Sequence, residues 1–199
     1  MSQRASSRSA SDRRVGSVAA GGAAAGVVAW LLGYAVTFLA AGDQVEQSLA
    51  DLNSIVGFVG GSEVPTWKAI SWLYLNAHMA VIRVTGLPGG SRSYDIIAES
   101  DSANAPLLYV LPPLAILLVT VAVVAIAGAR DVVSGAVGGA AVVVGYFLVT
   151  GVVALLSAHS FGGSVTVAVA LVPALLLAGF AYPLVCGSVG GALVGLVRS

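Results

Sequence analysis

Residues 132–197 read VVSGAVGGAAVVVGYFLVTGVVALLSAHSFGGSVTVAVALVPALLLAGFAYPLVCGSVGGALVGLV, a run of 66 residues without Asp, Glu, Lys or Arg. A helix needs about 20 apolar residues to cross the roughly 30 Å hydrocarbon core of a membrane. The run is too long for one crossing, and its polar, glycine-rich stretch 157–164 divides it into two. We expect spans at about 134–157 and 165–186.

Two further uncharged runs precede this stretch. Residues 15–42 and 102–129 are each long enough for one crossing, and they predict spans at about 16–41 and 106–128. The apolar stretches are continuous and show no alternation of period two, so helices are favoured over strands. The predicted fold class is an all-α integral membrane protein with four transmembrane helices and one or two interfacial amphipathic helices on the outer side.

The composition excludes several other classes of protein. Charged residues make up 9% of the 199 residues, against about 25% in soluble domains. A soluble enzyme, a nucleic-acid-binding protein and a disordered chain are therefore excluded. The sequence holds no metal-spaced His/Cys cluster, phosphate-binding loop or nucleophile elbow, so we expect no enzyme, no cofactor and no catalytic, cofactor-binding or metal site.

The few charged residues predict the orientation, because basic residues favour the cytoplasmic side. With the N-terminus inside, six basic and two acidic residues lie inside, and three basic and seven acidic residues lie outside. The inner basic residues are Arg4, Arg8, Arg13, Arg14, Arg130 and Arg198. We expect the cytoplasmic membrane, both termini cytoplasmic, and the segment 42–105 outside. Residues 1–14 are expected to form a disordered basic tail and residues 15–199 a single membrane domain.

The first span has an alternative interpretation as a cleaved signal peptide, with a small-residue site at Leu39–Gly42. An apolar run of this length exceeds the 7–15 residues of a secretory signal, which favours a retained span.

The expected outer segment carries two helical patterns. Within 43–63, an apolar stripe of Val45, Leu49, Leu52, Val56 and Val59 predicts a helix on the outer leaflet or against the bundle. Residues 67–87 also read as a helix, with polar seams and an aromatic end. A fifth span would bring His78 and Arg83 into hydrocarbon, at about 2.5–3.5 kcal/mol for a central Arg, so an interfacial or bundle-packed helix is favoured.

Three outer-side polar residues are candidate functional residues: Asn76, His78 and His159. Small residues four apart let helix backbones approach closely, and they predict helix packing at Gly22, Gly26, Gly135, Gly139, Gly187, Gly191 and Gly195. This packing is expected either within the monomer or between copies of a homo-oligomer. Prolines at 112–113, 173 and 183 are expected to kink or break their helices.

Three stretches carry a resemblance: Gly33–Leu39, Trp67–Trp72 together with Asn76–His78, and Leu107–Pro113. Through them the chain resembles an uncharacterised family of haloarchaeal multi-pass membrane proteins, whose members are often labelled "transporter" without evidence. The resemblance covers most of residues 16–197. It implies membrane residence and a salt-loving archaeal source, and it implies no established activity, so no catalytic residue is carried over.

Three functions remain open on these grounds. A structural or interaction component of the membrane accounts for the glycine faces and for the lack of charge inside the spans. A small transporter or channel subunit that acts as an oligomer accounts for the proline breaks. An intramembrane enzyme has almost no residues to support it. The first function is favoured, with the lipid bilayer as partner, no nucleic acid bound and any small-molecule substrate unknown.

Overall fold

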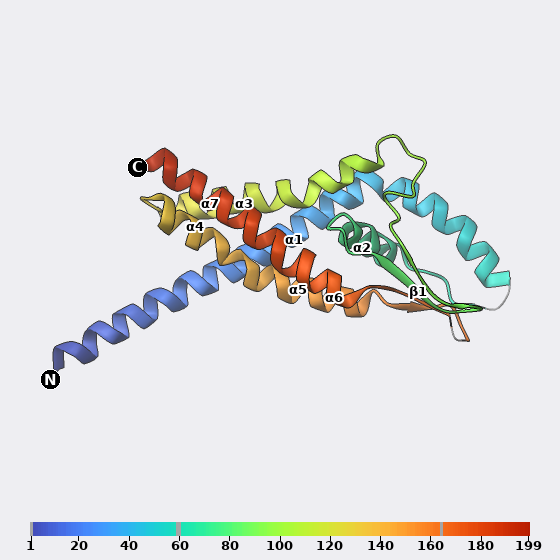
Figure 1. Cartoon of the computed structure of the whole chain (residues 1–199), viewed down its shortest axis with the longest axis horizontal. Helices are drawn as coiled ribbons and strands as arrows, with labels where there is room; N and C mark the ends of the chain where they lie inside the picture. Colours follow the sequence, from blue (N-terminus) through green and yellow to red (C-terminus); the bar gives the residue numbers. More distant parts are fainter. Residues whose placement is uncertain (1, 59–60, 164) are drawn as a thin grey trace.

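The computed structural model of the chain describes residues 2–58, 61–163 and 165–199 (Figure 1). Long helices lie lengthwise, a small sheet lies at one end, which we call the sheet end, and both termini lie at the opposite end (Figure 1). Within the described residues, four helices are long and apolar enough to cross a membrane. They are Ala20–Phe58, Ala105–Ala127, Val132–Leu156 and Leu171–Arg198. The four predicted apolar helices are therefore confirmed as helices.

The first helix is longer than the sequence predicts. Helix α1 runs from Ser2 to Phe58 without interruption. Residues 2–14 of the predicted tail and residues 43–58 of the predicted surface helix are therefore continuous with the first apolar segment, and residues 61–63 are not helical. Residues 2–58 contain no proline, and extending an existing helix costs far less than starting a new one. Val59, the last residue of the predicted stripe, lies outside the described residues.

The second apolar helix begins with a 3-10 turn. The element η1 (Ala105–Val110) leads directly into α3 (Leu111–Ala127). Pro112 and Pro113 stand in the first turn of α3, where a missing backbone N–H removes no helical hydrogen bond. The expected kink at this pair is wrong, because the prolines begin the α-helix and do not interrupt it.

The third apolar helix consists of α4 (Val132–Ala140) and α5 (Val142–Leu156), which meet at Ala141. Asp131 caps the start of α4, since its carboxylate accepts a hydrogen bond of 2.9 Å from the Ser134 backbone N–H. A side-chain cap of this kind replaces a hydrogen bond that the first helical turn lacks.

The fourth apolar helix begins and ends later than predicted, at Leu171 and Arg198 in place of 165 and 186. It consists of α6 (Leu171–Pro173), a π-helical stretch η2 (Ala174–Ala181) and α7 (Tyr182–Arg198). The π-helix lies between Pro173 and Pro183. Proline disturbs the regular hydrogen-bond ladder, and a wider helical turn accommodates the disturbance. This irregularity agrees with the proline breaks expected from the sequence.

A four-stranded antiparallel sheet corrects the predicted all-α fold class. Its strands are β1 (Ile82–Leu87), β2 (Gly90–Tyr94), β3 (His159–Ser160) and β4 (Thr166–Val169), in the order β2-β1-β4-β3. Ile82 pairs with Val169 and Thr85 with Thr166. The β-branched residues of β1 and β4 suit strands, and each strand supplies the partner that the other needs. The predicted helix over 67–87 is therefore wrong in its second half.

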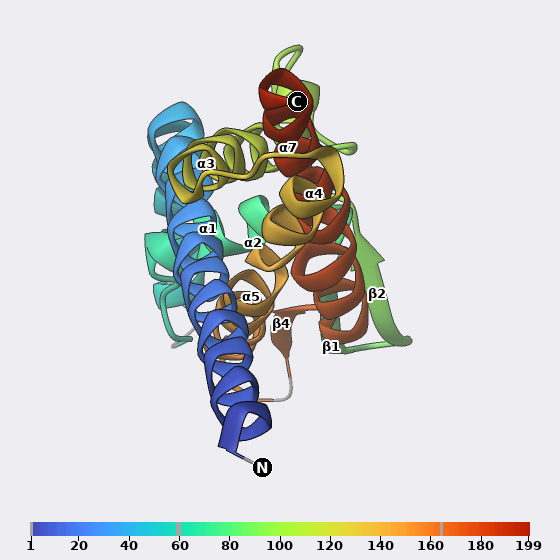
Figure 2. The same cartoon turned by 90° about the vertical axis from the view of Figure 1, so that its left-hand side faces the viewer.

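The first half of that segment is helix α2 (Thr66–Asn76), and every residue from Ile70 to Asn76 is buried. Viewed along the bundle, α2 lies among the long helices (Figure 2), and it contacts α1, α5 and β4. The bundle-packed alternative is confirmed for Thr66–Asn76, whereas one helix or a fifth span over all of 67–87 is wrong. The chain enters the bundle as α2 and returns towards the sheet end as β1.

Candidate functional site

A hydrogen-bonded cluster of three side chains lies inside the bundle. We call Tyr74, His78 and Tyr146 the His78 cluster. His78 Nδ1 lies 2.8 Å from the Tyr74 carbonyl oxygen, and His78 Nε2 lies 2.7 Å from the Tyr146 hydroxyl. The hydroxyls of Tyr74 and Tyr146 are also 2.7 Å apart. Tyr74 comes from α2, His78 from the turn that follows α2, and Tyr146 from α5.

The acceptors in the His78 cluster determine the direction of its hydrogen bonds. A backbone carbonyl can only accept, so the neutral imidazole carries its proton on Nδ1 and donates to Tyr74. The Nε2 atom then accepts from the Tyr146 hydroxyl, which in turn accepts from the Tyr74 hydroxyl. With this assignment, every polar hydrogen of the three side chains has an acceptor.

Aromatic rings enclose the His78 cluster. Trp30 of α1 meets the Tyr74 ring edge-on at 5.1 Å, and the Tyr182 ring lies 5.1 Å from the imidazole. The Tyr74 hydroxyl packs so closely against α1 that a side chain at Gly33 would overlap it. The imidazole is 0% exposed. The cluster is therefore sealed from the surroundings by α1, α5 and the last helix.

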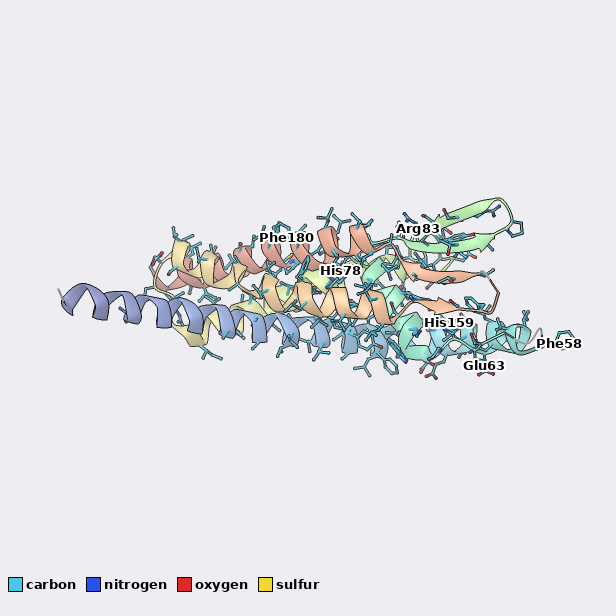
Figure 3. The ribbon with its side chains drawn as sticks, turned by 90° about the horizontal axis from the view of Figure 1, so that it is seen from below. Phe58, Glu63, His78, Arg83, His159 and Phe180 are labelled. Atoms are coloured by element: carbon cyan, nitrogen blue, oxygen red, sulfur yellow. The ribbon has the colours of Figure 1, made fainter. Side chains whose placement is uncertain are left out.

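The His78 cluster lies about halfway along the apolar helices. Tyr146 is close to the middle of Val132–Leu156, and Figure 3 shows His78 among the helices, away from Glu63 and Phe58 at the sheet end. The sequence places His78 in the expected outer segment 42–105. The structure buries its imidazole inside the bundle, in the turn that follows α2, which is not itself one of the four apolar helices.

Asn76 is buried and structural in its contacts. Its Oδ1 accepts the backbone N–H of Ile97 at 3.0 Å, and its Nδ2 donates to the Ala80 carbonyl at 3.3 Å. It thereby ties the end of α2 to the turn before β1 and to the loop after β2. That turn requires Met79 to adopt a φ of 64°, which is uncommon for a residue with a side chain. Asn76 thus faces protein.

His159 lies apart from the His78 cluster, in strand β3 at the sheet end (Figure 3). Its Nε2 is 3.1 Å from the Ser62 carbonyl oxygen, and its ring meets that of Phe161 edge-on at 5.0 Å. The side chain is half-buried. The structure therefore does not join the two histidines in one site. Within the described residues, no three His, Cys, Asp or Glu side chains are placed to hold a metal ion.

Two α2 side chains that the sequence analysis did not single out attach α2 to the end of α5. Trp72 Nε1 donates to the Ser157 carbonyl at 3.0 Å, and Lys68 Nζ donates to the Ala158 carbonyl at 2.5 Å. Carbonyls at a helix C-terminus lack helical partners and carry partial negative charge, so a lysine there is favourable. The only sequence signal was the aromatic end of the segment 67–87, whose two Trp and one Tyr are typical of a membrane interface.

The seven glycines predicted for helix packing all lie against backbone or small side chains of the same chain. A Cβ added at Gly191 would overlap the Gly135 carbonyl, and one at Gly139 would overlap the Gly187 carbonyl. These contacts join α4 to α7. Similarly, Gly26 of α1 lies directly against the backbone at the start of α5. Of the two expected arrangements, the structure shows packing within the monomer.

Three buried polar atoms of the described residues have no hydrogen-bond partner: Trp30 Nε1, Thr120 Oγ1 and Thr150 Oγ1. Thr150 lies one helical turn after Tyr146, and Trp30 packs on Tyr74. Buried polar groups usually have a partner. Two buried polar atoms without a partner, Trp30 Nε1 and Thr150 Oγ1, therefore belong to residues that adjoin the His78 cluster.

Comparison with known proteins identifies a family and no function. A protein-family model, described as a family of unknown function (DUF7978), matches residues 1–198 of the sequence. No curated protein and no solved structure matches the chain.

Proposed function

The chain belongs to the family of unknown function DUF7978, and we propose that it is a multi-pass protein of the cytoplasmic membrane with a structural or interaction role. In this proposal, four helices form a rigid body in the bilayer. The sheet end faces outwards and presents a surface to a partner, and both termini are cytoplasmic. The proposal is for a binding component, not for an enzyme.

The exposed side chains of the helices support residence in a membrane. Large apolar residues face outwards along all four apolar helices, among them Leu118 at 65%, Leu148 at 60% and Val172 at 65% exposure. Soluble monomers rarely expose contiguous apolar surface on this scale. Contact with lipid explains it, and an even number of crossings agrees with both termini lying at one end (Figure 1).

The uneven distribution of charge supports the orientation. Lys68, Arg83 and Arg92 lie towards the sheet end together with seven acidic residues, whereas the remaining six basic residues lie in the first part of α1, between α3 and α4, and at the end of α7. Basic residues favour the cytoplasmic side. The sheet end is therefore proposed to face outwards.

The observation that carries the proposed role is the attachment of α2 through the His78 cluster. Every polar hydrogen of its three side chains has an acceptor within the cluster, the Tyr74 carbonyl included, and a buried network satisfied in this way favours one fixed arrangement. The glycine contacts let the backbones of neighbouring helices pack closely against each other. A bundle fixed in this way suits a protein that holds a surface in place.

A small transporter or channel subunit, acting as an oligomer, is the second candidate. One observation favours it: an ionisable side chain lies at mid-height of the apolar helices, and such residues often mark proton or ion pathways. The π-helical stretch η2 between two prolines is a further feature that favours transport, since irregular helices often line binding sites in transporters.

Proton flux in liposomes separates the two functions. The purified chain is reconstituted with a pH-sensitive dye inside, a pH step is imposed, and the decay is compared with that of empty liposomes. The structural role predicts equal decay for the chain, for its His78→Gln variant and for empty liposomes. A faster decay that His78→Gln abolishes would establish transport and contradict the structural role.

The interaction role is tested with a photo-crosslinking amino acid placed at Phe58, whose side chain is 93% exposed at the sheet end (Figure 3). A discrete protein adduct is expected in native membranes. The same group at Val172, which is 65% exposed on the apolar surface, serves as control and should give lipid adducts. Lipid adducts alone at both positions would contradict a protein partner at the sheet end.

A further inference from the structure

A cavity of about 370 Å³ lies at the sheet end, between α1, α2 and the segment 96–108. Its size falls within the range of about 300–1,000 Å³ that small-molecule sites occupy. From its lining and position, we propose that it binds an uncharged, amphipathic membrane lipid, one with hydroxyl groups and no phosphate in its head. This inference rests on the proposed membrane location and goes beyond the proposed role.

The wall of the cavity that α1 forms carries no charged side chain, because its lining residues share one face of the helix. Positions 41, 44, 45, 48, 49 and 52 line it, and this spacing of three and four residues is one helix face. Asp43, Glu46 and Asp51 alternate with these positions in sequence and do not line the cavity. The charged side chains of this part of α1 are therefore kept away from a ligand.

The floor of the cavity is apolar and buried. Trp72 and Leu73 of α2, together with Ile97 and Ala105 from the opposite wall, lie among its lining residues, and each is less than 10% exposed. Small side chains such as Ala41 and Ala105 leave the space that larger residues would fill. Burying an apolar ligand surface here is favourable by about 25 cal/mol per Å².

Neutral polar groups lie at the rim. Gln44, Ser48 and Asn104 line the cavity and are exposed, and Ser100 and Ser102 lie half-buried beside them. Amide and hydroxyl groups both donate and accept hydrogen bonds, so they suit a hydroxyl-bearing head. None of the 17 lining residues is charged. An anionic phosphate head would have no cationic partner in this cavity.

The position of the cavity along the helices favours a ligand drawn from the bilayer. Ala40 and Ala41 lie near the end of the uncharged run 15–42, which is long enough for one crossing of the hydrocarbon core. Ala105, on the opposite wall, begins the second apolar helix. Both walls thus begin at the proposed edge of the hydrocarbon core and extend towards the polar side of the membrane. An amphipathic lipid covers the same two environments with its chains and its head.

Saturation binding of radiolabelled 1,2-dioleoylglycerol to the full chain in uncharged detergent micelles tests the inference. We expect saturable binding near one molecule per chain, with unlabelled dioleoylglycerol competing and dioleoylphosphatidylglycerol competing at least about tenfold less well. Ser48→Phe fills the cavity from an exposed position and should weaken binding at least about tenfold. Ala50→Phe is the matched control on the opposite face, and it should bind like the natural chain.

Gln44→Leu adds a test of the head-group contact. Loss of one neutral hydrogen bond should weaken binding about two- to tenfold while the apolar lining stays intact. The inference is overturned if binding does not saturate, if the anionic lipid competes equally, or if Ser48→Phe and Ala50→Phe behave alike. Recovery of the chain in the membrane fraction is measured separately, so loss of lipid binding leaves the membrane proposal standing.

Discussion

His78 and Tyr146, 68 residues apart in the chain, are joined by a hydrogen bond of 2.7 Å between the imidazole Nε2 and the phenol hydroxyl. The bond connects the end of α2 to the middle of the third apolar helix. It is the point at which the segment between the first and second apolar helices becomes part of the bundle interior.

Replacing Tyr146 by Phe removes the hydroxyl that accepts from Tyr74 and donates to His78. The Tyr74 hydroxyl and the His78 Nε2 atom are buried and would lose this partner, at a cost of about 1–3 kcal/mol of stability. Thermal unfolding in detergent should therefore show a lower Tm for Tyr146→Phe. The control Tyr34→Phe loses a single hydrogen bond of 3.2 Å to the Trp67 carbonyl. This bond is exposed, so its loss should change the Tm much less. Equal shifts for the two variants would contradict a special role of the His78 cluster.

Adjacent glycines of α4 give a matched pair of substitutions. Gly139→Ala would drive a Cβ into the Gly187 carbonyl, and overpacking of this kind costs about 1–3 kcal/mol. At Gly138 the nearest atom is 3.7 Å away, so Gly138→Ala should stabilise the helix by about 0.5–1 kcal/mol. Opposite shifts in Tm are expected. Shifts of the same sign would show that α4 and α7 do not pack as described.

Gly191→Leu distinguishes packing within the monomer from packing between copies. The residue lies against Gly135 of the same chain, so the expected result is loss of the folded monomer. Size-exclusion chromatography with mass measurement in mild detergent is the assay. A monomer that keeps its stability but no longer associates would place the glycine face between copies instead.

Single cysteines in a Cys186→Ala background test the orientation and the burial of α2. A membrane-impermeant maleimide applied to intact cells should label Arg92→Cys in β2, which is exposed at the sheet end. It should leave Arg130→Cys between α3 and α4 unlabelled until the membrane is permeabilised. Ala77→Cys, at a position that is 0% exposed, should stay unlabelled in both conditions. Labelling of Arg130→Cys in intact cells would reverse the proposed orientation.

The cap of α4 predicts a pH dependence. The Ser134 backbone N–H, and secondarily its hydroxyl, hold the pKa of the Asp131 carboxyl below its ordinary value of 3.8. A carboxyl with a lowered pKa in the folded state stabilises the fold above the pKa of the unfolded chain. This contribution is lost as the pH falls through the lower pKa of the folded state. Asp131→Ala should therefore lower the Tm at pH 7, and the difference should shrink towards pH 3.

Asp131→Asn is the control for the cap, since asparagine is also a good N-cap residue and has no charge to titrate. Its Tm at pH 7 should lie between those of the natural chain and Asp131→Ala. A difference between the natural chain and Asp131→Ala that is constant from pH 7 to pH 3 would contradict the role of the carboxylate.

The number of apolar helices and the glycine contacts could be predicted because both depend on local patterns. A run of about 20 apolar residues forms a helix long enough to cross a membrane whatever its neighbours are. Gly187, Gly191 and Gly195 share one face because of helical periodicity alone. The partner of that face was left open between two arrangements, since the repeat does not identify the helix it meets.

The segment 67–87 shows where the local pattern fails. Its apolar and polar residues fit a helix, yet Ile82–Leu87 forms a strand because β4 lies beside it. Strand pairing is non-local, and context overrides weak propensity in such short segments. The same pattern at 67–76 gave the correct element, helix α2, but left its environment open between the interface and the bundle, because amphipathic spacing fits both; the structure shows the bundle.

The four helices long and apolar enough to span a membrane, and the division of the charged residues along the chain, follow from local sequence, because hydrophobic length and charge are properties of contiguous residues. The burial of His78 inside the bundle, the pairing of β1 with β4 and the neutral cavity beside α2 follow from the fold. Each of these depends on contacts between residues far apart in the chain, and a fully buried polar side chain is stable only where the fold supplies its partner.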